Sequence, residues 1–340
     1  MRVMEIRDAF GLENLQAADR SDPQPGPGEV QLAMRAASLN YRDLLMVRGH
    51  YNPRQPLPLI PCSDGVGEVT AVGEGVSRVA VGDRVATTFS QRWIAGEPTP
   101  ERLRSTLGGP LDGTLAQSMV LDQEGVVKVP EHLTDEEAAT LTCAGLTAWS
   151  ALFTHGDVQP GDTVLTLGTG GVSIFALQLA KLAGARVIIT SSSDEKLERV
   201  RQLGADETLN YRQTPEWGKA VRELTDGRGV DLVVEVGGAG TLAESLKAVR
   251  FGGRIAMIGV LSGVATELAV TTLLMQQVRI QGILVGHRDG FEAMNRAVAA
   301  AEMRPVVDRT FPLAETREAL ETMGRGEHFG KICLNHFADL

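Results

Sequence analysis

Cysteine is scarce in this 340-residue chain, and its scarcity excludes two kinds of covalent framework. The three cysteines, Cys62, Cys143 and Cys333, are widely separated, and no two of them have C-x-x-C spacing. A disulfide framework needs an even set of cysteines and a zinc knuckle needs closely spaced pairs, so the sequence predicts neither. The same pattern indicates a reducing compartment.

The sequence also lacks long apolar runs and an excess of positive charge. No uninterrupted apolar stretch reaches the length that crosses a bilayer, and the first ten residues, MRVMEIRDAF, have no basic start followed by an apolar core. The chain has 33 basic and 43 acidic residues, a formal net charge of -10. We therefore expect a soluble, cytoplasmic protein whose main partner is neither nucleic acid nor a membrane.

Two patterns divide the chain. From Arg2 to about Val129, apolar and polar residues alternate between repeated glycines and prolines, which is typical of a small irregular β-barrel. Within this part we expect one short helix capped by Asp43, and a surface loop from Arg92 to Asp112. From about Thr140 to Gly286, strands, glycine turns and helices alternate, which indicates an α/β domain with helices on both faces of a parallel sheet.

The stretch LGTGGVS, residues 167–173, lies between a predicted strand at 164–167 and a predicted helix at 172–183. Gly168, Gly170 and Ser173 fall on the three positions of the dinucleotide fingerprint G-x-G-x-x-G, with a small serine in place of the third glycine. In this setting the turn predicts a pyrophosphate site at the helix N-terminus. The alternative is a packing turn in a domain that binds no nucleotide. The apolar face of the helix is expected to consist of Val172, Phe175, Leu179 and Leu182.

The end of the second strand indicates which dinucleotide binds. An acidic residue that holds a free ribose 2′-hydroxyl usually stands about 20 residues beyond the first glycine. Serines occupy 191–193 instead, and the acids that follow are explained by helix capping, because Ser192 and Glu195 have capping-box spacing. Serine hydroxyls and a nearby cation can accept a 2′-phosphate, so we expect NADPH, with NADH possible. The candidate contacts are Ser191, Ser192, Lys196, Tyr211 and Arg212.

Several further segments carry a family resemblance: AASLNYRDLLMVRGHY, LIPCSDGVGEVTAVGEGV, VGDRV, LTCAGLTAWSAL and HFGKICL. Together with the turn at Gly168, they resemble the medium-chain dehydrogenase/reductase superfamily over essentially the whole chain. The resemblance implies a GroES-like β-barrel catalytic domain made from residues 1–144 and 287–340. A Rossmann dinucleotide-binding domain, a doubly wound parallel sheet, is then inserted at 145–286.

The positions that hold catalytic zinc in zinc-containing members of this superfamily have changed here. They carry Asn40, the triplet Cys62-Ser63-Asp64, and Cys143, and only Cys143 is a plausible soft ligand. The segment 87–112, where the resemblance places four cysteines for a structural zinc, has no cysteine. Because one thiol and one carboxylate do not make a tetrahedral zinc site, we predict no metal. The chemistry should then shift toward acceptors that are already electron-poor.

The zinc-free branches of the superfamily, which include quinone, enoyl and alkenal reductases, match this chain at two site positions. One is Asn40 in the motif N-x-x-D with Asp43, and the other is Tyr51 after the glycine that ends the short helix. The resemblance implies that hydride passes to a conjugated carbonyl compound, an activated alkene or a quinone, while Tyr51 and Asn40 donate hydrogen bonds or a proton to its oxygen. Alternatively, Tyr51 is a loop aromatic and Asn40 a helix cap.

The remaining cofactor contacts are expected mainly at the carboxyl ends of parallel strands, where ligands of open α/β sheets bind. A predicted edge strand near 278–285 would expose unpaired backbone groups, and the resemblance implies that this strand joins two subunits of a homodimer. The expected contacts, by sheet position or by resemblance, are Thr147, Gly168, Gly170, Gly171, Val172, Gly237, Gly238, Gly259, Leu284, Val285 and Lys331.

Three functions are compatible with these observations. The first is an NADPH-dependent, zinc-free oxidoreductase that acts on a conjugated carbonyl compound, an activated alkene or a quinone. The second is a zinc-free NAD(P)-dependent alcohol dehydrogenase or carbonyl reductase. The third is a nucleotide-binding protein without turnover, which would bind NADPH and oxidise it with no acceptor.

Overall fold

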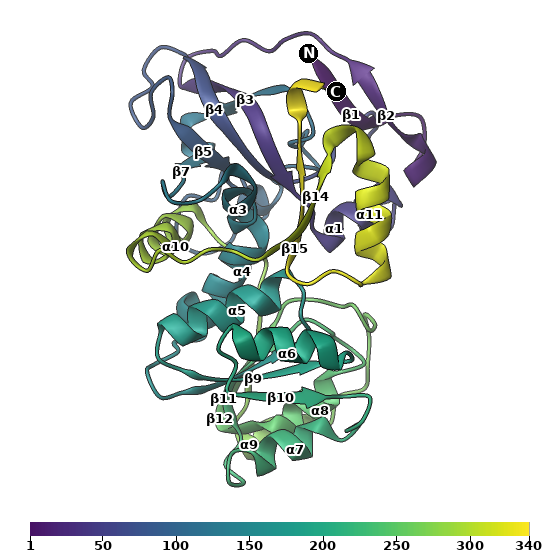
Figure 1. The fold of residues 1–340 in the computed structure, drawn as a ribbon, viewed down its shortest axis with the longest axis vertical. Coiled ribbons are helices and arrows are strands. Elements are labelled where there is room, and N and C mark those ends of the chain that lie inside the picture. Colours follow the sequence, from purple (N-terminus) through teal and green to yellow (C-terminus); the bar gives the residue numbers. More distant parts are fainter. Residues whose placement is uncertain (340) are drawn as a thin grey trace. The chain divides into compact units, whose positions relative to one another are not determined.

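The computed structural model describes residues 1–339 (Figure 1). The chain forms two compact units by its internal contacts. One unit combines Met1–Leu146 with the segment from Gly286 onward, and the other is Thr147–Val285. Among residues 1–339, no helix has both the length and the apolar character needed to cross a bilayer.

The second unit is built on a six-stranded sheet in which all neighbouring strands are parallel. The strand order is β10-β9-β8-β11-β12-β13, so the winding reverses between β8 and β11. This order confirms the predicted doubly wound sheet, and ligands of such sheets bind beyond the carboxyl ends at the reversal. The strands are β8 (Thr163–Leu167), β9 (Arg186–Ser191), β10 (Glu207–Asn210), β11 (Val230–Glu235), β12 (Val249–Met257) and β13 (Arg279–Gly282). The helices are α5 (Gly171–Leu182), α6 (Asp194–Gln202), α7 (Trp217–Glu223), α8 (Leu242–Ala248) and α9 (Val270–Gln276), and the short α4 (Leu146–Trp149) spans the unit boundary.

Helix α5 is buried on more sides than its sequence pattern predicts. Residues 173–177 are all buried, whereas Leu182 is 49% exposed and Val172 is half-buried. The predicted apolar face is therefore wrong at these two positions. The reason is that α5 contacts β8 and β9 on one side and the segment Ser150–Thr154 on another, so a single apolar stripe does not describe its packing.

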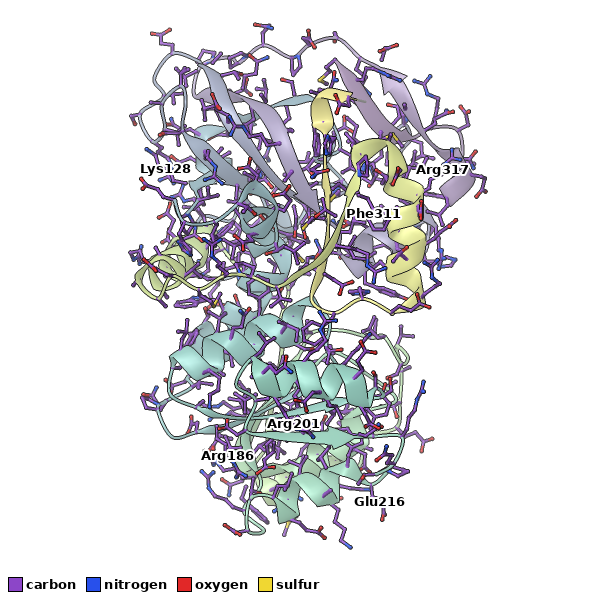
Figure 2. All side chains as sticks on the ribbon, viewed as in Figure 1. Lys128, Arg186, Arg201, Glu216, Phe311 and Arg317 are labelled. Atoms are coloured by element: carbon purple, nitrogen blue, oxygen red, sulfur yellow. The ribbon has the colours of Figure 1, made fainter. Side chains whose placement is uncertain are left out.

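Helix α6 starts from a different cap than expected. Ser193 is the N-cap, and its Oγ accepts a hydrogen bond from the backbone N–H of Lys196 at 3.3 Å. The predicted pair of Ser192 and Glu195 is thus displaced by one residue from the observed cap. Arg201, near the other end of α6, donates a hydrogen bond to Thr208 of β10 and ties the helix to the sheet edge (Figure 2).

The first unit contains a seven-stranded sheet of order β14-β15-β3-β4-β5-β7, with β6 also paired to β3. Strand β15 comes from the end of the chain and pairs antiparallel with β3, while β14 and β15 are parallel. The sheet strands are β3 (Glu29–Ser38), β4 (Asp64–Val72), β5 (Arg84–Thr87), β6 (Ser118–Asp122), β7 (Val126–Lys128), β14 (Val307–Pro312) and β15 (Lys331–Asn335), and a separate antiparallel pair is formed by β1 (Arg2–Ile6) and β2 (Leu15–Asp19). The helices are α1 (Tyr41–Val47), α2 (Pro100–Leu103), α3 (Asp135–Ala139), α10 (Arg288–Ala300) and α11 (Thr316–Arg325).

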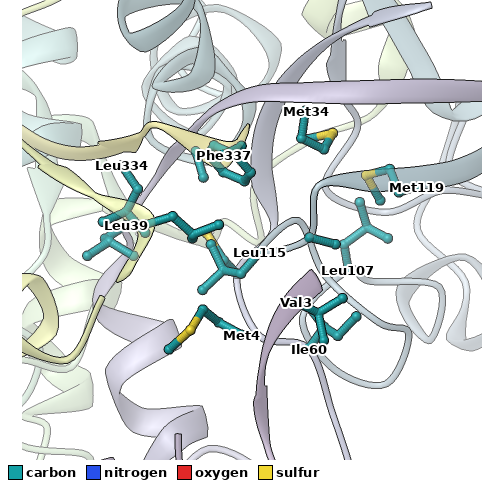
Figure 3. Close-up of a cluster of buried hydrophobic side chains, with 14 of the residues drawn as sticks. Val3, Met4, Met34, Leu39, Ile60, Leu107, Leu115, Met119, Leu334 and Phe337 are labelled. Carbon is teal, nitrogen blue, oxygen red and sulfur yellow. The ribbon is translucent and has the colours of Figure 1, made fainter. Parts of the chain in front are cut away.

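The core of the first unit joins both ends of the chain. Val3 and Met4 of β1 belong to the same buried cluster as Leu39, Leu334 and Phe337 (Figure 3). Each of these side chains is at most 4% exposed. Because burial of apolar area is the main favourable contribution to folding, this cluster explains why residues after 286 belong to the first unit.

Two local predictions in the first unit need correction. Helix α1 has Asn40 as its N-cap, and Asp43 is the third helical residue, whose Oδ2 accepts a hydrogen bond from the Asn40 backbone N–H at 2.8 Å. The helix therefore starts with a capping box rather than with Asp43 as the cap. The segment from Arg92 to Asp112 is not simply a surface loop, because it contains α2 and buries Leu107.

Candidate active site

The glycine turn between β8 and α5 leaves room for a ligand. Gly168 has a φ of 73°, a left-handed conformation that favours glycine. A Cβ on Gly168 or Gly170 would meet no other atom within 4 Å, so the space in front of the turn is open. Ser173 fits the third fingerprint position, because it is buried and its hydroxyl donates a 2.6 Å hydrogen bond to the carbonyl of Leu167. Backbone N–H groups at such a helix start can bind a pyrophosphate.

The predicted 2′-phosphate contacts lie at the ends of β9 and β10. The backbone N–H of Tyr211 donates a 3.1 Å hydrogen bond to the carbonyl of Ser191, so these two residues are neighbours. The nearby carboxylate of Asp194 accepts hydrogen bonds from Asn210 at 2.7 Å and from Gln213 at 3.0 Å. Asp194 is therefore engaged by its own unit, as expected of a structural rather than a ribose-binding acid.

The ends of β11 and β12 are organised by a carboxylate that sequence reasoning missed. Glu235 is fully buried, and its Oε1 accepts hydrogen bonds from the backbone N–H groups of Gly237 at 2.8 Å and Gly238 at 3.0 Å and from Thr241 at 2.6 Å. A Cβ on Gly259 would lie 2.3 Å from a backbone oxygen, so the two strand ends approach closely there. The available signal was an acid directly after the apolar run 232–234.

Other expected cofactor contacts in the second unit differ in exposure. Thr147 and Val285 are buried, while Leu284 is exposed. Tyr51, Asn40 and Lys331 belong to the other unit. The part played by each of these residues in cofactor binding stays a prediction.

In the first unit, the half-buried Asn40 forms a polar cluster with the buried Asp64 and Lys331. The Lys331 ammonium donates to the carbonyl of Leu39 at 2.5 Å and to Asn40 Oδ1 at 2.6 Å, and it lies 3.9 Å from Asp64 Oδ2. Asp64 Oδ1 accepts a 2.8 Å hydrogen bond from the Ser63 hydroxyl, and its Oδ2 accepts one from the backbone N–H of Cys143 at 3.3 Å. Sequence reasoning named Lys331 and Asn40 but did not pair them.

Burial and charge set the ionisation of this cluster. Burial raises the pKa of Asp64 to about 6, against the opposing effects of Lys331 and the Asn40 side chain. Burial also raises the pKa of the Cys143 thiol, and the Asp64 carboxylate adds to the effect. Cys143 is therefore a neutral thiol near neutral pH rather than a reactive thiolate.

A second charged pair stands beside the cluster. Asp43 is buried, and its Oδ1 lies 3.6 Å from Arg42 Nη1. The Arg42 guanidinium also donates to the carbonyls of Leu107 and Gly109, at 3.0 and 3.2 Å, and its Cζ lies 4.9 Å from the centroid of the Tyr51 ring. Tyr51 itself is 44% exposed, and its ring is held by a cation.

The residues of this cluster do not fit a zinc ion. Within residues 1–339, no group of three or more histidine, cysteine, aspartate or glutamate side chains is arranged to hold a metal. Both oxygens of Asp64 already accept hydrogen bonds, and the nearby Lys331 ammonium would repel a cation. The donor set around Asn40 is therefore unsuited to tetrahedral zinc.

Comparisons with known proteins define the family. Residues 26–131 match the model of the alcohol dehydrogenase GroES-like domain, and residues 171–300 match that of a zinc-binding dehydrogenase. A zinc-type alcohol dehydrogenase-like protein of Schizosaccharomyces pombe is 42% identical over 98% of this chain and 99% of its own length. Its similarity to this chain therefore extends across both units.

Solved structures agree with these matches. The structure of an NAD-dependent alcohol dehydrogenase is similar to this one with a TM-score of 0.90 and 37% identity, over 98% of this chain and 99% of the other. A mycobacterial protein in complex with NADPH has a TM-score of 0.82 and 28% identity, over the same shares of the two chains. The fold and the matches are those of a two-domain NAD(P)-dependent oxidoreductase.

The chain belongs to the medium-chain dehydrogenase/reductase superfamily. The predicted combination of a GroES-like domain and a Rossmann sheet is confirmed. As an oxidoreductase of this superfamily the protein is an enzyme, so the alternative of a nucleotide-binding protein without turnover is wrong.

Proposed function

We propose that this enzyme is an NADPH-dependent, zinc-independent oxidoreductase that reduces a conjugated carbonyl compound, an activated alkene or a quinone. The observation that carries the proposal is the Lys331 ammonium beside Asn40 and Asp64, at a position where the donor set does not suit zinc. The absence of a metal to polarise an ordinary carbonyl favours an acceptor that is already electron-poor.

The second unit would hold the cofactor, which supplies the hydride when bound. The open space at Gly168 and Gly170 suits the pyrophosphate, and Ser191 and Ser192 suit a 2′-phosphate. The neighbouring acid Asp194 is hydrogen-bonded to Asn210 and Gln213, so its carboxylate is held by its own unit and not left to bind a ribose hydroxyl. This arrangement supports NADPH over NADH.

The first unit would stabilise the negative charge that develops on the acceptor oxygen. The Asn40 amide can donate a hydrogen bond to that oxygen, and the hydroxyl of the half-exposed Tyr51 can donate a hydrogen bond or a proton. Both groups are neutral while they donate hydrogen bonds, and Tyr51 gains a negative charge only if it transfers its proton to the acceptor oxygen. The role of Asp43 is to hold the backbone of Asn40 through the capping box of α1.

A second candidate is a zinc-free NAD(P)-dependent alcohol dehydrogenase or carbonyl reductase. Two similar proteins favour this candidate by their names. One is a zinc-type alcohol dehydrogenase-like protein that is 42% identical, and the other is an NAD-dependent alcohol dehydrogenase that is 37% identical. This candidate requires that ordinary aldehydes or alcohols turn over at least as fast as enones and quinones.

The two candidates are separated by an acceptor panel. The purified enzyme is supplied with NADPH and an enone, a quinone or a simple aldehyde, and with NADP⁺ and an alcohol, each with added zinc and with a chelator. Our proposal predicts the highest kcat/KM with the enone or the quinone and the same rate under both metal conditions. Faster turnover of the aldehyde or alcohol under both metal conditions would establish the second candidate, and a rate that depends on zinc would overturn the metal-free assignment.

We further propose a homodimer joined along β13. This strand ends the sheet of the second unit, and its residues Arg279, Gln281 and Gly282 are exposed. Exposed apolar side chains of α9, Leu274 and Met275, add an apolar patch to the same unit. Light scattering on the purified enzyme should give twice the chain mass, and a monomer mass at all concentrations would rule the dimer out.

A further inference from the structure

The sheet register places Lys331 beside Asn40, although the two residues are far apart in the sequence. In the antiparallel pairing of β15 with β3, Cys333 lies opposite Ser38, and the backbone N–H of Leu39 donates to the carbonyl of Ile332 at 3.0 Å. Continuing that register by two residues brings Lys331 opposite Asn40. The backbone therefore fixes the lysine at this position before its side chain makes any contact.

The Lys331 side chain ends among three oxygens. These are the carbonyl of Leu39 at 2.5 Å, Asn40 Oδ1 at 2.6 Å and Asp64 Oδ2 at 3.9 Å, and the lysine is only 4% exposed. An ammonium has three protons to donate and no capacity to accept. A buried ammonium is tolerated only when such oxygens surround it, so the cluster is arranged around a fixed positive charge.

This arrangement determines which end of the Asn40 amide is available. Oδ1 accepts from the ammonium, and a flipped amide would place Nδ2, another donor, against the same ammonium. The opposite end, Nδ2, is buried and makes no hydrogen bond of normal geometry within residues 1–339, although the Asn40 side chain lies close enough to the Asp64 carboxylate to lower its pKa. A buried amide donor without a partner is costly, and one held at a candidate active site is ready to bind an oxygen of a ligand.

We propose that Lys331 is a positioning residue that holds the Asn40 amide with Nδ2 directed at the substrate oxygen, and so supplies the fixed positive charge of a site without a metal. The inference rests on the proposed role of Asn40 as an oxyanion donor. Lys331 acts through Asn40, while Asp64 balances its charge inside the protein. The chemical class recognised is an oxygen that gains negative charge during hydride transfer, such as an enolate or a quinol oxygen.

The test is a double-mutant cycle between Lys331→Met and Asn40→Ala. Methionine keeps the length of lysine without its charge, and the exposed Lys219 gives a matched control as Lys219→Met. We expect each single active-site variant to lose about 10- to 100-fold in kcat, with little change in KM. The double variant should lose no more than about twofold beyond Asn40→Ala, because the lysine acts through the asparagine. Lys331→Arg should recover part of the kcat.

A variant that removes the buried charges of both Lys331 and Asp64 keeps the test possible if the single variant does not fold. If Lys331→Met leaves Asp64 unpaired and does not fold, Lys331→Met combined with Asp64→Asn should fold and show the same dependence on Asn40. If the loss of kcat in the double variant equals the product of the losses in the two single variants, the inference is overturned. A wild-type kcat for Lys331→Met would also overturn it. Weaker NADPH binding with an unchanged kcat would instead make Lys331 a cofactor contact, which also overturns it.

The cycle is measured with the substrate that the wild type converts fastest. If that substrate is a simple alcohol or aldehyde, the proposed function fails, but the cycle still reports whether Lys331 acts through Asn40. If the wild type reduces an enone or quinone and the cycle shows independent effects, only the present inference fails.

Discussion

The guanidinium of Arg42 lies over the ring of Tyr51, with 4.9 Å between Arg42 Cζ and the ring centroid. The same Cζ lies 4.9 Å from the ring centroid of Phe89, so the cation is held between two aromatic rings. Its backbone-carbonyl partners at Leu107 and Gly109 fix it further. The half-exposed ring of Tyr51 is thereby held against a guanidinium that is itself fixed by hydrogen bonds.

Replacement of Tyr51 by phenylalanine tests the role of its hydroxyl. Because the ring keeps its contact with Arg42, Tyr51→Phe should leave the unfolding temperature unchanged and lower kcat by about 10- to 100-fold. Steady-state kinetics with an enone or quinone measures the loss. Tyr41→Phe is the matched control, since Tyr41 is equally exposed but belongs to the first turn of α1. Equal rates for wild type and Tyr51→Phe would remove Tyr51 from the mechanism.

Gly170→Ala separates binding from folding in the glycine turn. The added methyl group meets no protein atom within 4 Å, and Gly170 has a φ of -79°, which alanine adopts without strain. We therefore expect an unchanged unfolding temperature but NADPH binding weakened by at least about tenfold, because the methyl group would occupy space needed by the pyrophosphate. Fluorescence titration with NADPH measures this affinity. Gly290→Ala in α10, where an added methyl group would lie 3.4 Å or more from its neighbours, is the control, and unaltered affinity in Gly170→Ala would place the pyrophosphate elsewhere.

Ser192→Asp tests the choice between NADPH and NADH. A carboxylate at this half-buried position would repel a 2′-phosphate and accept a hydrogen bond from a free ribose hydroxyl. We predict that the ratio of kcat/KM for NADPH to that for NADH falls by about 10- to 100-fold. Asp194→Asn serves as the control, because that acid is already engaged by Asn210 and Gln213. An unchanged ratio of kcat/KM for NADPH to that for NADH in Ser192→Asp would show that other residues bind the ribose 2′ substituent of the cofactor.

Asp231 gives a prediction on pH and stability. Its burial would raise the pKa, but hydrogen bonds from Arg228, the Thr163 backbone N–H and Arg250 outweigh this effect and lower the pKa to about 2. A carboxyl whose folded pKa lies below its unfolded value of about 3.9 stabilises the fold above that pH and loses the effect as the pH falls toward 2. Asp231→Asn should therefore lower the free energy of unfolding by roughly 1–2 kcal/mol at pH 7, allowing for solvent screening.

Denaturant unfolding of wild type and Asp231→Asn at pH 7 and below pH 3 measures this difference. It should shrink as the pH falls from 3 toward the folded pKa of about 2, where the Asp231 carboxyl becomes protonated and loses its charge. The exposed Asp226 in the same unit provides the control variant Asp226→Asn, for which we expect a change within about 0.5 kcal/mol. A difference for Asp231→Asn that stays constant with pH would mean that its charge is not the stabilising factor.

Local pattern and long-range pairing explain what the sequence could predict. The turn at Gly168 was recognisable because its strand, glycines and helix lie within about 20 residues and each has its own periodicity. The contact between Lys331 and Asn40 was not recognisable, since it spans 291 residues and depends on the register of β15 with β3. The burial of Leu107 in a polar, proline-containing segment likewise depends on distant partners such as Arg42.

The most direct test of a zinc-independent mechanism is the metal content of the active enzyme. Purified protein that reduces an enone or quinone with NADPH is analysed by elemental mass spectrometry before and after dialysis against a chelator. Our account predicts zinc far below one ion per chain and an unchanged kcat after dialysis. One tightly held zinc per chain, whose removal abolishes turnover and whose return restores it, would contradict the account.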